Sequence, residues 1–244
     1  MNEIDRQFPS EAEIADKFGD VDVWIFDLDN TLYPARSGLW REIDMRITHY
    51  LASLHGLDGL SARAMQRFYR QRDGATLRGL MNDGFERLDE FLTFVHDIDR
   101  SALEPDPELQ REICRLPGRR FVFTNGSKGH AVETLARLGL EGVFEDSFDI
   151  KAAEFVPKPE AAAYDAFLRR YDVDPRRAAM FEDLALNLEV PKARGMTTTL
   201  VLGSAEAGAS GGAVEAGGRS SAADFQVVNL PVFLARVNRV LSAR

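Results

Sequence analysis

The sequence is poor in cysteine and histidine. Cys114 is the single cysteine among 244 residues, which excludes a disulfide within the chain and a cysteine-based zinc site. This usage is typical of a reducing compartment, so we expect a cytoplasmic protein. None of the four histidines has a paired metal-binding spacing such as H-E-x-x-H, and we assign none of them a chemical role. They are His49, His55, His96 and His130.

Long apolar runs and an excess of basic residues are also missing. No stretch of about 18 apolar residues occurs, so no membrane-spanning segment is expected. The first twenty residues lack the basic start and apolar stretch of a secretory signal. Lys and Arg number 30 against 39 Asp and Glu, which gives a net charge of −9. Because nucleic acids and anionic membranes are bound by clustered Lys and Arg, we expect neither as a partner.

The composition is that of a folded protein, with 45% hydrophobic and 28% charged residues. The length fits one large domain or one domain that carries an insert. Segment 203–221, GSAEAGASGGAVEAGGRSS, consists almost wholly of Gly, Ala and Ser, and we expect a mobile surface loop there.

Strand-like apolar runs alternate with helical periodicity at the start of the chain and again after Pro105. Ser10 and Glu13 form a capping box that predicts a short helix ending near Gly19. The expected strands are 21–29, 119–125, one near Phe148, 178–183, 197–202 and 225–228. Strands separated by helices form right-handed βαβ units, so the pattern predicts an α/β fold with a parallel sheet covered by helices. Ligands of such sheets sit at the carboxyl ends of the strands.

Between about Gly38 and Leu103 the apolar residues follow helical spacing and no convincing strand occurs. Trp40, Ile43 and Ile47, for example, recur at intervals of three and four residues. This pattern predicts an inserted all-helical domain at 38–103, between core segments 1–37 and 104–244.

Acidic residues follow two of the expected strands. Asp27 and Asp29 alternate at the end of the first strand, which would place both carboxylates on one face. Glu182 and Asp183 end the strand AAMFED. Any one of these acids alone is more often a solvated loop residue, but four that converge indicate a hard-cation site, and oxygen ligands favour Mg²⁺. We expect the Asp27 and Asp183 carboxylates and the Asp29 carbonyl as ligands, with Glu182 holding a metal-bound water.

An anion site is expected after the strand RRFVFTN. Thr124, Asn125 and Gly126 precede a helix, so a hydroxyl, an amide and backbone N–H groups meet at a helix N-terminus. The alternative is that Thr124 or Ser127 only caps this helix.

Lys158 lies between two prolines in VPKPE, which restrict the backbone around it. A lysine held beside an acidic crevice can offset its charge. Because four carboxylates alone would repel a phosphate, we expect both a cation and Lys158 to be required for phosphate binding.

The order of these motifs resembles that of the haloacid dehalogenase (HAD) superfamily of aspartate-nucleophile phosphohydrolases. The matching segments are DLDNT, TNG, PKP and FEDLALN, and the helical insert is similar to that superfamily's first-class (C1) cap. The segments FDLDNTLYP, YRQRDGATLRGL, VHDID and FEDLALNLEVPKARGM look most like the pyrimidine 5′-nucleotidase group. Asn187 departs from the pattern, since many superfamily members carry a further acid there.

The resemblance implies a reaction and a role for each motif residue. Asp27 would be the nucleophile that forms an aspartyl phosphate, and Asp29 the general acid and base. Thr124, Asn125, Gly126 and Lys158 would bind the phosphate, and Mg²⁺ would be the cofactor. In the cap, we expect three residues near Gly74 to contact the substrate: Tyr69, Arg72 and Thr76. An equally good interpretation is that these residues are solvated polar side chains at a helix end.

The resemblance also implies a class of substrate and leaves several alternative functions open. The substrate would be a small phosphorylated metabolite, foremost a pyrimidine nucleoside 5′-monophosphate. Phosphoglycolate, a sugar phosphate or pyridoxal phosphate stays open as substrate, because the leaving group is selected by the cap. A 2-haloacid dehalogenase, a phosphomutase and a non-catalytic binding protein are further alternatives. Whether the protein is a monomer or a homodimer is left open.

Overall fold

Six parallel strands form the centre of the protein in a computed structural model that describes residues 9–203 and 220–243. Their order is β3-β2-β1-β4-β5-β6, and each neighbouring pair is parallel. The strands are β1 (Val23–Phe26), β2 (Arg119–Phe123), β3 (Asp146–Phe148), β4 (Ala178–Glu182), β5 (Thr197–Val201) and β6 (Phe225–Val227). The expected α/β class is confirmed. Most of the Gly/Ala/Ser segment at 203–221 lies outside the described residues.

Ten α-helices connect or flank the strands in the described ranges. They are α1 (Glu11–Phe18), α2 (Leu39–His55), α3 (Gly59–Asp73), α4 (Thr76–Asn82), α5 (Leu88–His96), α6 (Pro107–Arg115), α7 (Lys128–Arg137), α8 (Ala161–Tyr171), α9 (Ala185–Ala193) and α10 (Leu230–Ser242), with two short 3₁₀ helices, η2 (Ala35–Ser37) and η3 (Pro175–Arg177). The predicted capping box opens α1: the Ser10 side chain accepts from the Glu13 N–H, and the Glu13 side chain accepts from the Ser10 N–H.

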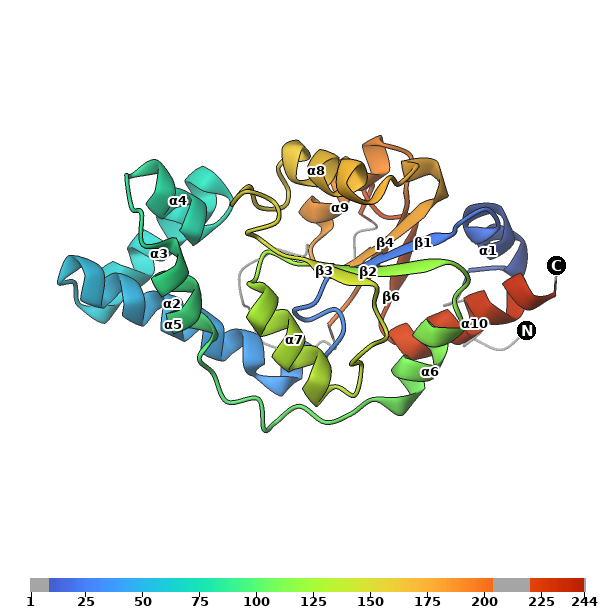
Figure 1. Cartoon of the computed structure of the whole chain (residues 1–244), viewed down its shortest axis with the longest axis horizontal. Coiled ribbons are helices and arrows are strands. Elements are labelled where there is room, and N and C mark those ends of the chain that lie inside the picture. The colour runs from blue at the N-terminus through green and yellow to red at the C-terminus, as the bar shows by residue number, and fades with distance from the viewer. Residues whose placement is uncertain (1–8, 204–219, 244) are drawn as a thin grey trace.

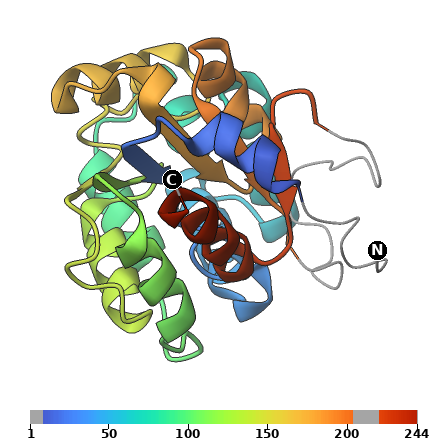
Figure 2. The same cartoon turned by 90° about the vertical axis from the view of Figure 1, so that its right-hand side faces the viewer.

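Both faces of the sheet are covered by helices, which explains why β1 is buried along its whole length. Trp24 and Phe26 face an apolar cluster with α1, α6, α7 and α10, whereas Val23 and Ile25 face a second cluster with α8 and α9. The two layers are visible on opposite sides of the sheet in Figure 1 and, from the end of α10, in Figure 2. Alternate side chains of a strand point to opposite faces, so a central strand must be apolar throughout.

The four helices α2 to α5 lie together to one side of the sheet, between β1 and β2 in the chain (Figure 1). They share an apolar cluster of their own that includes Tyr50, Leu51, Tyr69 and Phe91. The helical character expected for this stretch is thus observed, while its boundaries as a domain at 38–103 stay a prediction. Within the described ranges, no helix combines the length and apolar character needed to cross a membrane.

Candidate active site

The chain turns directly after β1. Asp27 still continues the ladder, because its N–H donates to the Phe181 carbonyl at 2.9 Å. The Leu32 N–H then donates to the Leu28 carbonyl at 3.0 Å, and Asn30 has a φ of 61°. Strand alternation therefore ends before Asp29. The alternation argument therefore does not apply to Asp29, but both carboxylates line the same cavity, where they contact different partners.

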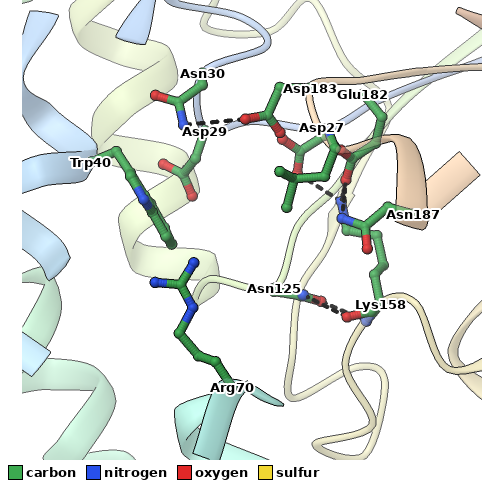
Figure 3. A pocket seen from close by; sticks show the side chains of 11 residues that line it. Asp27, Asp29, Asn30, Trp40, Arg70, Asn125, Lys158, Glu182, Asp183 and Asn187 are labelled. Carbon is green, nitrogen blue, oxygen red and sulfur yellow. Dashed lines mark hydrogen bonds and ion pairs between the residues drawn. The ribbon is translucent and has the colours of Figure 1, made fainter. Parts of the chain in front are cut away.

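Lys158 is buried along one side of the crevice, next to Glu182 and Asn187 (Figure 3). Its Nζ donates to Asp27 Oδ1 at 2.7 Å, to Glu182 Oε1 at 2.8 Å and to the Phe123 carbonyl at 2.8 Å. A buried ammonium is stable only when it is paired and hydrogen-bonded, as it is here. The expectation that Lys158 reaches the acidic crevice agrees with this geometry.

Asn125 holds the backbone of Lys158. Its Oδ1 accepts from the Lys158 N–H at 2.8 Å, and its Nδ2 donates to the Lys158 carbonyl at 3.1 Å. Both bonds come from the single side chain that follows β2, so the loop before α8 is fastened to the end of the neighbouring strand. The side-chain role of Asn125 is thus to position the lysine, which the sequence did not indicate.

Asp27, Glu182 and Asp183 form a group that could hold a metal ion, with one oxygen from each lying within 4.8 Å of the others. The neighbouring strands β1 and β4 bring them together, because Phe26 pairs with Phe181. Burial, opposed by Lys158 and aided by Glu182, raises the pKa of Asp27 to about 7. Burial and the charges of Glu182 and Asp27 also raise the pKa of Asp183. Crowding makes it costly for these carboxylates to carry their negative charges together. A hard divalent cation bound between them would offset those charges.

Glu182 accepts hydrogen bonds from three donors in its surroundings. Oε2 accepts from the Leu184 N–H at 2.7 Å, and Oε1 accepts from Asn187 Nδ2 at 2.6 Å as well as from Lys158. Asn187, which departs from the superfamily pattern, therefore donates a hydrogen bond to the Glu182 carboxylate. An acidic residue at position 187 would repel that carboxylate. This leaves Glu182 better suited to hold a water than to bind a cation directly.

The Asp29 side chain is not part of that metal-binding group. Its Oδ1 accepts from the Tyr33 hydroxyl at 2.5 Å and lies 2.8 Å from His130 Nε2. Burial opposes ionisation, but the interactions with His130 and Tyr33 outweigh it and hold the pKa of Asp29 below its usual value. The metal role expected for Asp29 uses its backbone carbonyl and stays a prediction. His130 was missed, because a lone histidine in a helix carries no sequence signal.

The residues after β2 mainly bind one another. Thr124 Oγ1 accepts from the Gly126 N–H at 2.9 Å, and Ser127 caps α7 by accepting from the His130 N–H at 3.3 Å. Of the three residues expected at the anion site, Asn125 lines the cavity, whereas Thr124 and Gly126 are not among its lining residues. Ser127 is thus the residue that caps the helix, as the alternative interpretation expected, whereas Thr124 stabilises the turn before it.

The cavity has a volume of about 80 Å³ and is also lined by Trp40 of α2 and Arg70 of α3 (Figure 3). The expected contact residues Tyr69, Arg72 and Thr76 do not line it. Tyr69 is buried among the helices and donates to Asp83, which Arg72 also binds. Successive helix residues are rotated by about 100°, so Arg70 points to the crevice when Tyr69 points away.

Known proteins are similar to this chain in sequence or in fold. A yeast (Saccharomyces cerevisiae) protein, phosphate metabolism protein 8, is 26% identical over 135 residues, which cover 50% of this chain and 41% of that protein. The match thus spans less than half of the yeast protein's length. Among solved structures, a HAD phosphatase from Thermococcus onnurineus superposes with a TM-score of 0.56 at 18% identity, over 91% of this chain and 98% of that chain.

An L-2-haloacid dehalogenase superposes with a TM-score of 0.53 at 16% identity, over 91% of this chain and 99% of that chain. At such identities the two structures share the fold, and both reactions occur on it. Residues 21–193, more than two thirds of the chain, match the haloacid dehalogenase-like hydrolase family. The matched range contains β1, β4 and every residue of the crevice described above. The protein therefore belongs to the haloacid dehalogenase-like hydrolases.

Proposed function

We propose that the protein is a Mg²⁺-dependent phosphatase that hydrolyses small phosphomonoesters through an aspartyl phosphate on Asp27. The observation that supports this most is the buried Lys158 bridging Asp27 and Glu182, with Asp183 in the same crevice. A dehalogenase of this fold needs no metal and usually lacks the second Asp, so Asp29, Glu182 and Asp183 together speak against that reaction. Lys158 and a cation together would offset enough carboxylate charge for a phosphate to enter.

Asp27 is the nucleophile in this proposal. Its carboxylate attacks phosphorus in line with the leaving oxygen, so the P–O bond to the leaving group breaks as the bond to Asp27 forms. Lys158 stabilises the ionised carboxylate before the attack and lies next to the oxygens that gain charge during it. Burial of this pair excludes competing hydrogen bonds from solvent.

Asp29 is the general acid and base. It gives a proton to the departing alcohol oxygen and later takes one from the water that hydrolyses the aspartyl phosphate. Its pKa is low in the ligand-free protein. The negative charge of a bound phosphate raises the pKa of a nearby carboxyl group, which favours the protonated form when substrate is present.

Asp27, Asp183 and the Asp29 carbonyl would hold Mg²⁺, with Glu182 accepting from a bound water. When bound, the ion offsets the charge of the carboxylates and of the phosphate. The mutual repulsion that raises the pKa of Asp183 is the property of this chain that such an ion would relieve.

The substrate we propose is a pyrimidine nucleoside 5′-monophosphate, presented to the helices α2 to α5 as a cap. Trp40 offers a flat ring to a nucleobase, and Arg70 offers donors to base carbonyls or to a second phosphate oxygen. Both residues lie across the cavity from Asp27, where the leaving group of a phosphoester would point (Figure 3). The competing substrates phosphoglycolate and sugar phosphates lack an aromatic ring for Trp40.

A phosphatase screen tests the proposal. Uridine and cytidine monophosphates, purine nucleotides, sugar phosphates, phosphoglycolate and pyridoxal phosphate are compared with and without Mg²⁺. We expect phosphate release that requires Mg²⁺ and favours the pyrimidine nucleotides. Equal rates for all substrates would remove the nucleotidase assignment but keep the phosphatase one, whereas halide release from 2-chloropropionate without phosphatase activity would overturn both.

A further inference from the structure

The two oxygens of the Asp29 carboxylate have different surroundings. Both hydrogen bonds recorded for this side chain within the described residues end on Oδ1, from Tyr33 at 2.5 Å and His130 at 2.8 Å. The side chain of Asp29 is 12% exposed and lines the cavity. An oxygen that already accepts two hydrogen bonds is a poor site for an additional proton, so Oδ2 is the oxygen available for proton transfer.

Tyr33 is a fixed donor. Burial and the neighbouring Asp29 carboxylate raise the pKa of Tyr33 well above its usual value. The phenol therefore keeps its proton and donates it to Asp29 Oδ1.

The tautomer of His130 is set by Arg100. Arg100 Nη2 lies 3.1 Å from His130 Nδ1, and a guanidinium has only donors, so Nδ1 must accept. A neutral imidazole with an accepting Nδ1 carries its proton on Nε2, which points at Asp29. Arg100 cannot easily turn away, because it also donates to the carbonyls of His96 and Ile98 and pairs with Glu133 at 2.7 Å.

The His130 ring is held in its plane by packing. It is 1% exposed and stacks on His96 with centroids 4.5 Å apart. Gly126 lies against its edge, where an added Cβ would come within 3.1 Å of His130 Cδ2. His96 in turn is fastened by its Nδ1 to the Ser127 hydroxyl at 3.0 Å. Thr134 Oγ1 also lies near Nδ1, at 3.5 Å.

We propose that Arg100 and His130 are positioning residues that keep an Nε2–H donor on Asp29 Oδ1 and so reserve Oδ2 for proton transfer. This inference rests on the proposed function. In the first step, the Oδ2–H proton moves to the leaving oxygen as the P–O bond breaks. In the second, Oδ2 takes a proton from water as its oxygen attacks the aspartyl phosphate. With the opposite tautomer, the Nε2 lone pair would face the carboxylate and draw the proton onto Oδ1, away from the substrate.

A leaving-group series tests the catalytic part of this inference. General acid catalysis is worth about 10²–10⁴-fold, and its loss matters most for poor leaving groups. We expect His130→Leu to lower kcat by about 10- to 100-fold on phenyl phosphate and by less than about threefold on p-nitrophenyl phosphate, with KM unchanged. His130→Gln, whose amide can donate from nearly the position of Nε2, should recover most of the loss. His49→Leu, the same change at an exposed histidine of α2, is the control and should change neither rate.

Two results would overturn the inference: equal losses on both substrates, or a Gln variant no better than the Leu variant. The tautomer itself is read by ¹⁵N NMR of the histidine rings, which does not depend on turnover. We expect the neutral Nε2–H form for His130 in the wild-type protein and a mixture in Arg100→Met. A doubly protonated or Nδ1–H ring in the wild-type protein contradicts the arrangement. Wild-type protein with this tautomer but no phosphatase activity would instead refute the proposed function and the role in it.

Discussion

Lys158 Nζ lies 2.7 Å from Asp27 Oδ1, although the two residues are 131 positions apart in the chain. Both side chains are almost fully buried, at 1% and 8% exposure. The same ammonium group binds Glu182, so two carboxylates depend on one positive charge. The pair therefore determines both the charge of the crevice and part of the stability of the fold.

Removing this ammonium group should destabilise the protein in a pH-dependent way. The folded-state pKa of Asp27 is raised to about 7, so between pH 4 and 7 the folded state binds more protons and stability falls as pH rises. Lys158→Met raises that pKa further. We expect a loss of about 3–5 kcal/mol at pH 7.5 and a clearly smaller loss at pH 5.5, measured by urea unfolding.

Lys128→Met is the matched control. Lys128 also pairs with a carboxylate at 2.8 Å, but its side chain is 59% exposed. Exposed ion pairs contribute at most about 1 kcal/mol, so this variant should stay close to wild type at both pH values. Equal losses in the two variants would contradict the importance given to the buried pair.

Asp27→Asn should abolish phosphatase turnover while the protein stays folded. An amide is a poor nucleophile, and loss of an essential nucleophile costs about 10⁴-fold or more in kcat. The rate is measured with p-nitrophenyl phosphate and folding by circular dichroism. Asp20→Asn, an exposed change of the same kind, should retain full activity. Turnover by the Asp27 variant at more than about a thousandth of the wild-type rate would reject Asp27 as nucleophile.

Mg²⁺ should raise the melting temperature more at pH 8 than at pH 5.5. Protons and the cation compete for the same carboxylates, and the raised pKa values of Asp27 and Asp183 mean that protons win at low pH. A thermal shift that is the same at both pH values would speak against a metal at these acids.

Asp183→Asn distinguishes the effect of charge repulsion among the three carboxylates from the effect of metal binding. Without Mg²⁺ it removes one of three crowded charges, so we expect a melting temperature higher by about 2–4 °C for each kcal/mol of repulsion relieved. With Mg²⁺ the shift should largely disappear. Asp16→Asn, at an exposed position of α1, should leave both values unchanged. A metal-free Asp183 variant that melts below wild type would show that the repulsion is not the dominant effect.

Arg70→Gln and Arg72→Gln should differ in substrate binding. Arg70 lines the cavity and pairs with Asp44 at 3.4 Å, whereas Arg72 pairs with Asp73 and Asp83 and does not line the cavity. Loss of a charged hydrogen bond to substrate raises KM by about 10-fold or more, which we expect for Arg70→Gln with uridine monophosphate. Arg72→Gln should leave KM unchanged. A raised KM for Arg72→Gln and an unchanged KM for Arg70→Gln would instead support Arg72, which the sequence indicated, as the residue that contacts the substrate.

Gly79→Ala should destabilise the protein through the packing of α3 against α4. A Cβ at this position would lie 2.2 Å from Cδ1 of Tyr69, which is 2% exposed. Overpacking of this kind costs about 1–3 kcal/mol. Gly59→Ala adds the same methyl group to a helix where nothing lies within 4 Å, so no loss is expected there. Equal urea midpoints for both variants would disprove the steric conflict.

The sequence predicted much of the architecture because local and periodic signals carry it. The Ser10 capping box, the apolar run of β1 and the acids that end β4 each depend on neighbouring residues, and each is observed where it was expected. The placement of Glu182 near Asp27 also followed, since parallel strands present their carboxyl ends at one edge.

Side-chain direction was not predictable in the same way. Asp29 leaves the strand conformation in a turn, and its true neighbour is His130, 101 residues away. Arg70 and not Tyr69 lines the cavity, because one residue of helix rotation decides which side chain faces the sheet. The composition and the hydrophobic periodicity of the sequence thus determined which helices and strands form and at which strand ends the acidic residues lie. Which atoms meet in the crevice was decided by tertiary contacts, since hydrogen bonds depend on positions to a fraction of an ångström and local patterns do not carry that precision.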